Sequence, residues 1–497
     1  MAIPRKLIFN NIQIKYGPIS GVFLIAFALR LFRLGYHDFW YDEIGSVGYA
    51  LCPWNHWNAP LYGIVLHFWV KIFGVSEFSL RMPSLIFSFL SVVLIFFFGK
   101  ELFNKKTGLI AASLMALSPF HLWYAQEARD YSMLLFFGLL SSCFLFKALK
   151  NPDGKNWIFF LLASLAGLYA NYFFIFLFIA QGRYVGMFKK AAFSLKTVIC
   201  FLLVILWFTL YLPRFLEKFY FVWAGFWLPK PEWKSLLITF ENFLLGYSGT
   251  PLLYFVMNVL AVASFMCGLI AIRGNKEFKN NFVFCCGLTF IPVMLAFVFS
   301  RTFFSVYLDR GLIVFSPYFY LIVSLGVVSA KRAARISLLC ILGLLFIIAD
   351  YRYFTDRMYE PLIHHIGTYI KKPIRPLVRF IEDNLKPNDT LAFTHPAPLN
   401  EYGFYSRIKS KSIYQFFDPQ FLDSRWQRPV WEDKYRLPFY KINGLEFERL
   451  WVVSSNWAKN GTLDEHSQSV KNWLEENFKR EFEKEFNGVW VFRYVKN

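Results

Sequence analysis

Residues 17–34 read GPISGVFLIAFALRLFRL, and residues 36–46 read YHDFWYDEIGS. The first run is apolar over about the length that a helix needs to cross a bilayer. Two adjacent carboxylates, Asp42 and Glu43, follow it within the second run. Charges are costly in hydrocarbon, so a carboxylate pair at a membrane boundary is either a solvated rim or a working site. The aromatic residues directly before the pair can partly desolvate it and alter its pKa, which favours a working site.

The composition indicates a membrane protein. The 497 residues are 56% hydrophobic and 21% aromatic, and the mean hydropathy is positive. Many apolar runs of about 20 residues, separated by short basic linkers, are typical of a polytopic α-helical membrane protein. The net charge of +20 does not indicate a nucleic-acid partner, because the lysines and arginines lie between the spans, as topology selection produces. The seven cysteines are scattered and predict no disulfide framework or metal cluster.

Basic residues also predict the topology. Those before the first span place the N-terminus in the cytoplasm and the loop with Asp42 and Glu43 outside. The apolar stretch 157–188 is too long for one span and has lysines at both ends, so we expect two short helices that turn near Asn171. With this choice we predict about eleven transmembrane helices in a multi-pass protein of the cell membrane.

The last third of the chain changes character after Tyr351, and beyond Lys371 no run could span a bilayer. Its pattern of strands and helices predicts a small α/β domain, which the odd span count places on the extracytoplasmic side. It contains no glycine-rich phosphate loop or nucleophile elbow, which favours a lid or accessory role. The predicted domains are 1–355, transmembrane and including a first outer loop at 36–82, and 356–497, soluble. The predicted elements of the soluble domain are helices at 376–385 and 467–478 and strands at 390–393, 450–454 and 488–495.

Isolated arginines accompany the carboxylates on the predicted outer side. Each alone would more often be a snorkelling or capping charge than a ligand contact. However, the guanidinium group is a planar fork of donors that suits phosphate. Several of them at one membrane face could hold an anionic lipid head group while a carboxylate does chemistry beside it. The four candidates are Arg30, Arg81, Arg129 and Arg310.

The order and spacing of several motifs resemble the GT-C glycosyltransferases of the protein O-mannosyltransferase and aminoarabinose transferase group. The resemblance is best over about the first 150 residues. One departure is that the family often has His-Pro-Pro before Leu-Tyr, whereas this chain has Asn58-Ala59-Pro60, with His56 two residues earlier. The motifs are the Asp-Glu pair with an arginine twelve positions before Asp42, Pro60-Leu61-Tyr62, Leu80-Arg81-Met82-Pro83-Ser84, and Ser118-Pro119 followed by Glu127-Ala128-Arg129-Asp130-Tyr131.

The resemblance implies a GT-C fold and transfer of a sugar from a polyprenyl-phosphate carrier to an acceptor on the extracytoplasmic face, with inversion at the anomeric carbon. An acceptor hydroxyl needs a general base, for which we choose Asp42, with Glu43 orienting or assisting it. Arginines can neutralise the leaving phosphate, so no cofactor is required, although the carboxylates could bind a divalent metal. The carrier phosphate is assigned to Arg81 and Arg129, with Arg30 and Arg310 as further candidates, and the substrate-side candidates are His56, Tyr62 and Glu127.

Two other classes of protein are compatible with a charged membrane protein. A transporter or flippase of a lipid-linked or anionic substrate would be expected to show inverted repeats and broken helices near the midplane. No clear internal repeat is present, and the charges cluster at one face. A non-catalytic scaffold would not need the Asp-Glu pair near arginines. For a transferase, a protein, a glycolipid and a cell-wall polysaccharide are all open as acceptors.

Overall fold

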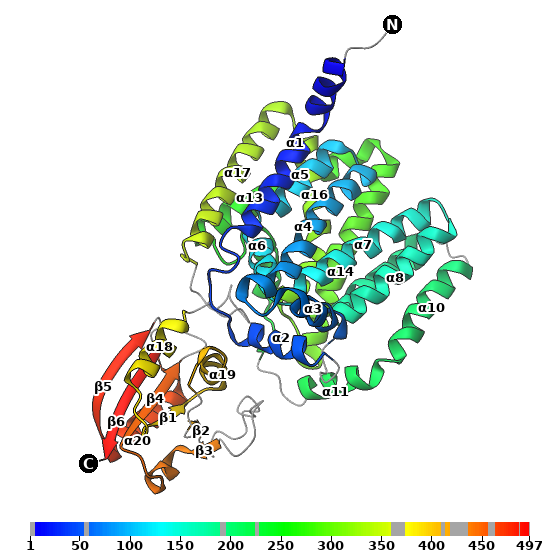
Figure 1. Cartoon of the computed structure of the whole chain (residues 1–497). Coiled ribbons are helices and arrows are strands. Elements are labelled where there is room, and N and C mark those ends of the chain that lie inside the picture. Colours follow the sequence, from blue (N-terminus) through cyan, green and yellow to red (C-terminus); the bar gives the residue numbers. More distant parts are fainter. Residues whose placement is uncertain are drawn as a thin grey trace. The chain divides into compact units, whose positions relative to one another are not determined.

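The computed structural model of the chain describes residues 5–53, 59–188, 195–223, 228–358, 373–408, 413–417, 436–455, 463–486 and 488–496. The chain divides into two compact units, which Figure 1 shows as a helical part and a part with a sheet. The helical unit contains Met1–Leu34, Tyr49–Ala224 and Leu228–Gly367. The sheet unit contains Gly35–Gly48, Gly225–Trp227 and Thr368–Asn497.

The helical unit is built from long apolar helices joined by short turns. Their bounds are α1 Arg5–Leu31, α3 Pro60–Phe73, α4 Glu77–Leu102, α5 Lys105–Leu117, α6 Pro119–Ala125, α7 Tyr131–Lys150, α8 Gly154–Ala170, α9 Phe174–Phe188, α10 Leu195–Thr209, α11 Leu212–Trp223, α12 Trp233–Leu245, α13 Pro251–Ala271, α14 Lys276–Thr302, α15 Asp309–Leu312, α16 Ser316–Ser329 and α17 Arg332–Phe354. Helix α2, Tyr41–Leu51, begins in the sheet unit and ends in the helical unit.

Among the described residues, six helices are long and apolar enough to cross a membrane, or up to eight if two bent pairs each form one span. The bent pairs are α5 with α6, at 62°, and α10 with α11, at 71°. Several further apolar helices, such as α8 and α9 with 17 and 15 residues, are shorter than a usual span. The multi-pass architecture is therefore present, and the count of about eleven stays a prediction.

The predicted break in the apolar stretch 157–188 is confirmed. Helix α8 ends at Ala170 and α9 begins at Phe174. The Asn171 side chain stabilises the turn, because its Oδ1 accepts the backbone N–H of Phe173 at 2.9 Å. A short polar side chain that bonds to nearby backbone is typical of such turns.

Helix α16 forms the centre of the helical unit. The apolar window of its span is 94% buried, whereas the windows of α13 and α17 are 22% and 28% buried. Side chains on α13 such as Leu252 and Phe255 are exposed, which is expected of a surface in contact with lipid. Helix α16 approaches α13 closely at Gly326, where a Cβ would overlap the carbonyl of Ser264. Small residues at such contacts let membrane helices pack by their backbones.

The sheet unit is a six-stranded mixed sheet covered by helices on both faces (Figure 1). The strand order is β3-β2-β1-β4-β6-β5; the first four strands are parallel and the last two pair antiparallel to their neighbours. Helix α20 packs on one face, and α18 and α19 pack on the other. The bounds are α18 Arg375–Asn384, β1 Thr390–Phe393, α19 Pro396–Tyr405, β2 Ile413–Phe417, β3 Arg436–Pro438, β4 Arg449–Ser455, α20 Glu465–Asn477, β5 Phe478–Phe486 and β6 Val489–Lys496.

The five elements predicted for this part of the chain are present as α18, β1, β4, α20 and β6, and their bounds differ from the predicted ones by at most two residues. The predicted division at 355/356 differs from the observed one, which follows Gly367. The predicted outer loop 36–82 also divides, because its first part, Gly35–Gly48, belongs to the sheet unit. The physical reason is that Asp38 accepts hydrogen bonds from the backbone at the start of α18.

Candidate active site

The turn between α6 and α7 carries the motif that contains Glu127 and Arg129, and Gln126 attaches this turn to the end of α1. Its Nε2 atom donates to the carbonyls of Arg30 and Phe32 at 2.9 and 2.7 Å. Its Oε1 atom accepts the hydroxyl of Tyr353 at 2.8 Å. The last carbonyls of a helix have no partner within the helix, so a side-chain amide that caps them fixes the turn in place.

Arg129 and Arg310 are brought together at one aromatic ring. The guanidinium carbons lie 5.8 and 5.6 Å from the centre of the Tyr131 ring. Both distances lie in the range of a cation–π contact. Tyr131 is only 5% exposed and Arg310 only 8% exposed. Two cations in a buried place repel each other, so this arginine pair (Arg129 and Arg310) creates a position that favours an anion.

Two carboxylates belong to the same neighbourhood. Glu127 is 1% exposed. Asp130 accepts a hydrogen bond from the Asn171 side chain at 3.0 Å. Burial raises the pKa of the Asp130 carboxyl, and the positive charges of Arg129 and Arg310 oppose this rise. The carboxylates therefore compensate part of the charge of the arginine pair within the protein.

Three motifs that are separate in sequence are joined behind this turn. Ser84 Oγ donates to the carbonyl of Arg129 at 2.9 Å and contacts the hydroxyl of Tyr62 at 3.0 Å. Ser84 is fully buried and Tyr62 is 3% exposed. The two side chains support the backbone of Arg129, so they fix the position from which its guanidinium extends.

Arg310 is positioned by the residues just before it. Asp309 accepts hydrogen bonds from Thr239 at 2.9 Å and from Asn242 at 2.6 Å, both on α12. The hydroxyl of Tyr307 also bonds to Thr239, at 2.8 Å. Burial raises the pKa of Tyr307, and the charge of Asp309 raises it further. The α12 side chains thus hold the short segment before α16 that presents Arg310.

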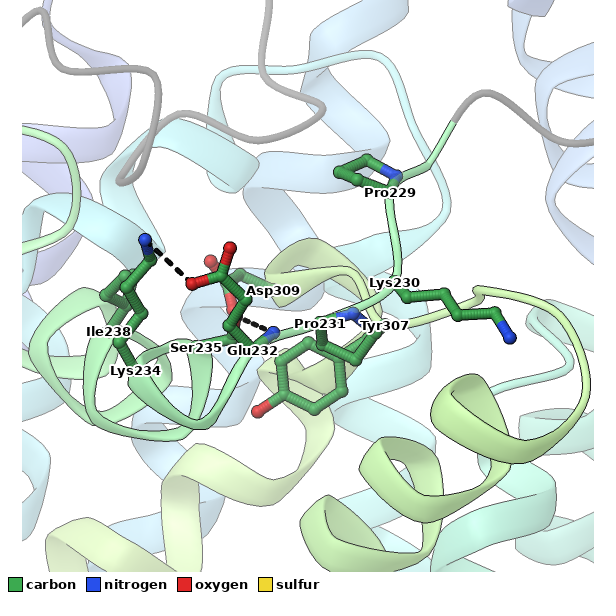
Figure 2. A pocket seen from close by; sticks show the side chains of 9 residues that line it. All are labelled: Pro229, Lys230, Pro231, Glu232, Lys234, Ser235, Ile238, Tyr307 and Asp309. Atoms are coloured by element: carbon green, nitrogen blue, oxygen red, sulfur yellow. Dashed lines mark hydrogen bonds and ion pairs between the residues drawn. The ribbon is translucent and has the colours of Figure 1, made fainter.

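A pocket of about 140 Å³ opens beside this segment (Figure 2). Figure 2 shows the ion pair between Lys234 and Glu232 at its wall, with an N···O distance of 2.8 Å. Glu232 is also the N-cap residue of α12, and its backbone N–H donates to the Ser235 hydroxyl in a capping box. The residues that line the pocket are Pro229, Lys230, Pro231, Glu232, Lys234, Ser235, Ile238, Tyr307 and Asp309.

The other two predicted phosphate ligands have structural contacts in the helical unit. Arg30 is fully buried, and its guanidinium donates to the Ser88 hydroxyl and to the carbonyls of Ala26, Ala116 and Met115 at 2.8 to 3.1 Å. Arg81 is 1% exposed and donates to the carbonyl of Leu34 at 3.0 Å. These contacts hold α1 against its neighbours.

Asp42 and Glu43 lie in the first turn of α2, within the sheet unit. The carbonyl of Trp40 accepts the N–H groups of Glu43 and Ile44 at 2.9 and 3.0 Å, which starts the helix. Glu43 is fully buried and Asp42 is half-buried. Carboxylates in a first turn are stabilised as anions by the helix dipole. His56, the remaining predicted candidate, lies outside the described residues.

Sequence reasoning missed Gln126, Asn171 and Tyr131 as members of the site. Asn171 had a signal, since it was the expected turn residue, but its bond to Asp130 joins positions 41 residues apart. Within the described ranges, no group of three or more His, Cys, Asp or Glu side chains is arranged to hold a metal ion.

Comparisons with known proteins agree with the resemblance seen in the motifs. A family model for dolichyl-phosphate-mannose-protein mannosyltransferase matches residues 57–216. The putative mannosyltransferase YkcB of Bacillus subtilis (strain 168) is 27% identical over 129 residues, which are 26% of this chain. The match spans only 17% of the length of that curated relative.

Solved structures define the fold. The crystal structure of ArnT from Cupriavidus metallidurans in the apo state has a TM-score of 0.62 and 13% identity, over 97% of this chain and 98% of that chain. ArnT bound to undecaprenyl phosphate has a TM-score of 0.57, also at 13% identity, over 96% and 98% of the two chains. The expected class is therefore confirmed in its coarser part: the chain is mostly helical and has the fold of ArnT, and its resemblance to the GT-C glycosyltransferase group is shown, whereas the eleven spans and the extracytoplasmic side of the C-terminal domain stay predictions.

Proposed function

We propose that this protein is an integral membrane glycosyltransferase. It transfers a sugar from a polyprenyl-phosphate carrier to an acceptor on the extracytoplasmic face, with inversion. The observation that carries the proposal is the arginine pair on the Tyr131 ring. The family match over residues 57–216, which includes Arg129, and the ArnT structure with undecaprenyl phosphate support it.

The arginine pair is proposed to bind the carrier phosphate. A guanidinium group can donate two parallel hydrogen bonds to two oxygens of one phosphate, and burial strengthens the electrostatic attraction between them. As the bond between the anomeric carbon and the phosphate oxygen breaks, the phosphate keeps the electron pair and gains negative charge. Donors already aimed at that charge stabilise the transition state without reorganisation. Arg30 and Arg81 are assigned instead to holding α1 and the residues after it, because Arg30 donates to Ser88 and to two carbonyls of α5, and Arg81 donates to the carbonyl of Leu34.

Asp42 is proposed as the general base. It accepts the proton of the acceptor hydroxyl as the acceptor oxygen forms its bond to the anomeric carbon. A single displacement of this kind inverts the configuration at that carbon. Glu43, buried beside it in the same helical turn, is proposed to orient the acceptor or the base. The eleven-span topology, with a cytoplasmic N-terminus and an extracytoplasmic C-terminal domain, belongs to the same proposal.

The test of the base is Asp42→Asn, which keeps the shape and removes the proton acceptor. We expect sugar transfer to fall by about 10²–10⁴-fold, the usual scale of general-base catalysis. Purified protein is incubated with polyprenyl-phosphate hexoses and pentoses and a membrane extract, and the released polyprenyl phosphate is measured by mass spectrometry. A matched control is Asp153→Asn, which removes a carboxylate at the N-terminus of α8 and is expected to leave transfer unchanged. Near-normal transfer by Asp42→Asn would contradict the assignment.

A further inference from the structure

The segment directly before the carboxylate pair is fastened to the C-terminal domain by Asp38. One carboxylate oxygen, Oδ2, accepts the backbone N–H groups of Ile374 and Arg375, both at 2.8 Å. The other, Oδ1, lies 3.3 Å from Nε of Arg375. Asp38 is 7% exposed. The carboxylate therefore caps the N-terminus of α18 and forms an ion pair there, which are two interactions that a helix start favours.

The next residue, Phe39, makes a second attachment within the same unit. Its backbone N–H donates to the hydroxyl of Tyr405 at 2.6 Å. Its ring meets the Phe404 ring edge-on, with the centroids 5.5 Å apart. The guanidinium of Arg375 lies 5.0 Å from the centre of the Tyr405 ring. The same arginine thus contacts both attachments, and Phe39 is 1% exposed.

In the C-terminal domain, the partners of Asp38 and Phe39 belong to helices that are packed against the sheet. Helices α18 and α19 bury Ile374, Leu377 and Tyr402 against the sheet. On the other side, α2 begins at Tyr41, one residue after the buried Trp40. Only three residues separate Asp38 from Asp42. No flexible linker intervenes, so the position of the first turn of α2 follows the position of the sheet.

We propose that the C-terminal domain positions the carboxylate pair Asp42–Glu43, and that Asp38 and Arg375 are the positioning residues. The domain then contributes to catalysis, because it holds the first turn of α2, with Asp42 and Glu43, in the position that reaction with the acceptor requires. The inference rests on the proposed function in one respect, the role of Asp42 as the base.

Kinetics of Asp38→Ala test the proposal. A misplacement of about 1 Å can cost about 10²-fold in rate, so we expect kcat to fall by about 10- to 100-fold. The KM for the lipid donor is expected to stay near the wild-type value, because the arginine pair is untouched.

The matched control is Asp464→Ala. Asp464 caps α20 through the Ser467 N–H at 2.8 Å and pairs with His395 at 2.5 Å, so it also combines a helix cap with an ion pair. It lies in the same domain, but the partners of its side chain are at the start of α20 and at His395 before α19, not in the segment 35–48. Asp464→Ala is expected to lower the melting temperature while kcat of the folded protein stays near wild type. Equal losses of kcat in both variants, or an unchanged kcat in Asp38→Ala, would overturn the proposal.

Hydrogen exchange separates this inference from the proposed function. In Asp38→Ala, the amides of residues 41–46 are expected to exchange at least about tenfold faster, while Asp464→Ala leaves them unchanged. This readout does not depend on transfer. If Asp42→Asn kept full activity, the base assignment would fall, and the exchange data would still decide whether the domain holds the turn. If Asp42→Asn were inactive and exchange were the same in both alanine variants, the positioning role alone would fail.

Discussion

The arginine pair depends on what a guanidinium group can do that an ammonium group cannot. It can stack on an aromatic ring by its face and donate hydrogen bonds in its plane, so Arg129 and Arg310 can both contact the Tyr131 ring without using their donors for that contact. Lysine would bring the same charge without the fork. This difference makes the role of Arg129 testable by substitution.

We predict that Arg129→Lys weakens transfer partially and that Arg129→Ala weakens it severely, by about 2–5 kcal/mol if the buried phosphate is left unpaired. The measurement is the melting temperature in detergent with and without polyprenyl phosphate. The wild type should be stabilised by the lipid, and Arg129→Ala should lose this stabilisation while its lipid-free melting stays near wild type. Arg214→Ala, which breaks an exposed pair with Glu217, is the control and should keep the full response to lipid.

A purely structural Arg129 would behave in the opposite way. If it only held the turn before α7 through the neighbouring carboxylates, Arg129→Ala would melt early without lipid. It would still gain full stabilisation from polyprenyl phosphate. That result would assign the residue to the scaffold.

The sequence identifies arginines near one face, but it does not distinguish a ligand from a structural contact. Arg30 is the arginine twelve positions before Asp42 in the motif, yet its partners are mostly backbone carbonyls on α1 and α5. Contacts to backbone carbonyls leave no signal in the pattern of side chains. Arg129 and Arg310 are 181 positions apart, and only the fold brings both to the Tyr131 ring. Residue types are therefore readable from the sequence, whereas their shared contact depends on tertiary structure.

At the scale of single elements, apolar length predicted the helices well because each helix must satisfy its own backbone in lipid. Strand β5 was missed for a physical reason. Its apolar residues, Phe478, Phe482 and Phe486, recur every four positions, which is a helical period. An irregularity between Arg480 and Phe482 shifts the register, so Phe478 packs in the core beneath α20 while Phe482 and Phe486 pack beneath α18.

The break between α8 and α9 gives a prediction at this scale. Asn171→Ala removes the acceptor for Phe173 N–H and the donor to Asp130 Oδ2. Because Asp130 is half-buried, the loss should destabilise the protein by about 1–3 kcal/mol. We expect a lower melting temperature and a weaker response to polyprenyl phosphate, since the turn with Arg129 loses its support. Asn156→Ala, on the exposed start of α8, should change neither quantity; if it lowers both as much, the effect is not specific to the break.

At the scale of the whole molecule, the charge distribution is the consequence of insertion into a membrane. The net charge of +20 lies in linkers such as Lys105-Lys106 and Lys331-Arg332, between helices whose outer faces are apolar. Arginines and lysines that remain in the cytoplasm fix the orientation of the helices around them. A single orientation of the helices therefore fixes the side of the membrane on which every loop lies.

This requirement gives a prediction for the intact protein, made in a cysteine-free background with single cysteines introduced in loops. Tyr36→Cys and Thr302→Cys should react with a membrane-impermeant maleimide on intact cells, because each residue lies at the end of a predicted span that leads to the outer side. Lys106→Cys and Arg332→Cys should react only after the membrane is opened, because basic linkers stay in the cytoplasm. All four residues are exposed, so failure to react reports sidedness and not burial. Labelling at Tyr36→Cys without labelling at Thr302→Cys would mean that α8 and α9 do not both cross the bilayer, and the eleven-span topology would be wrong.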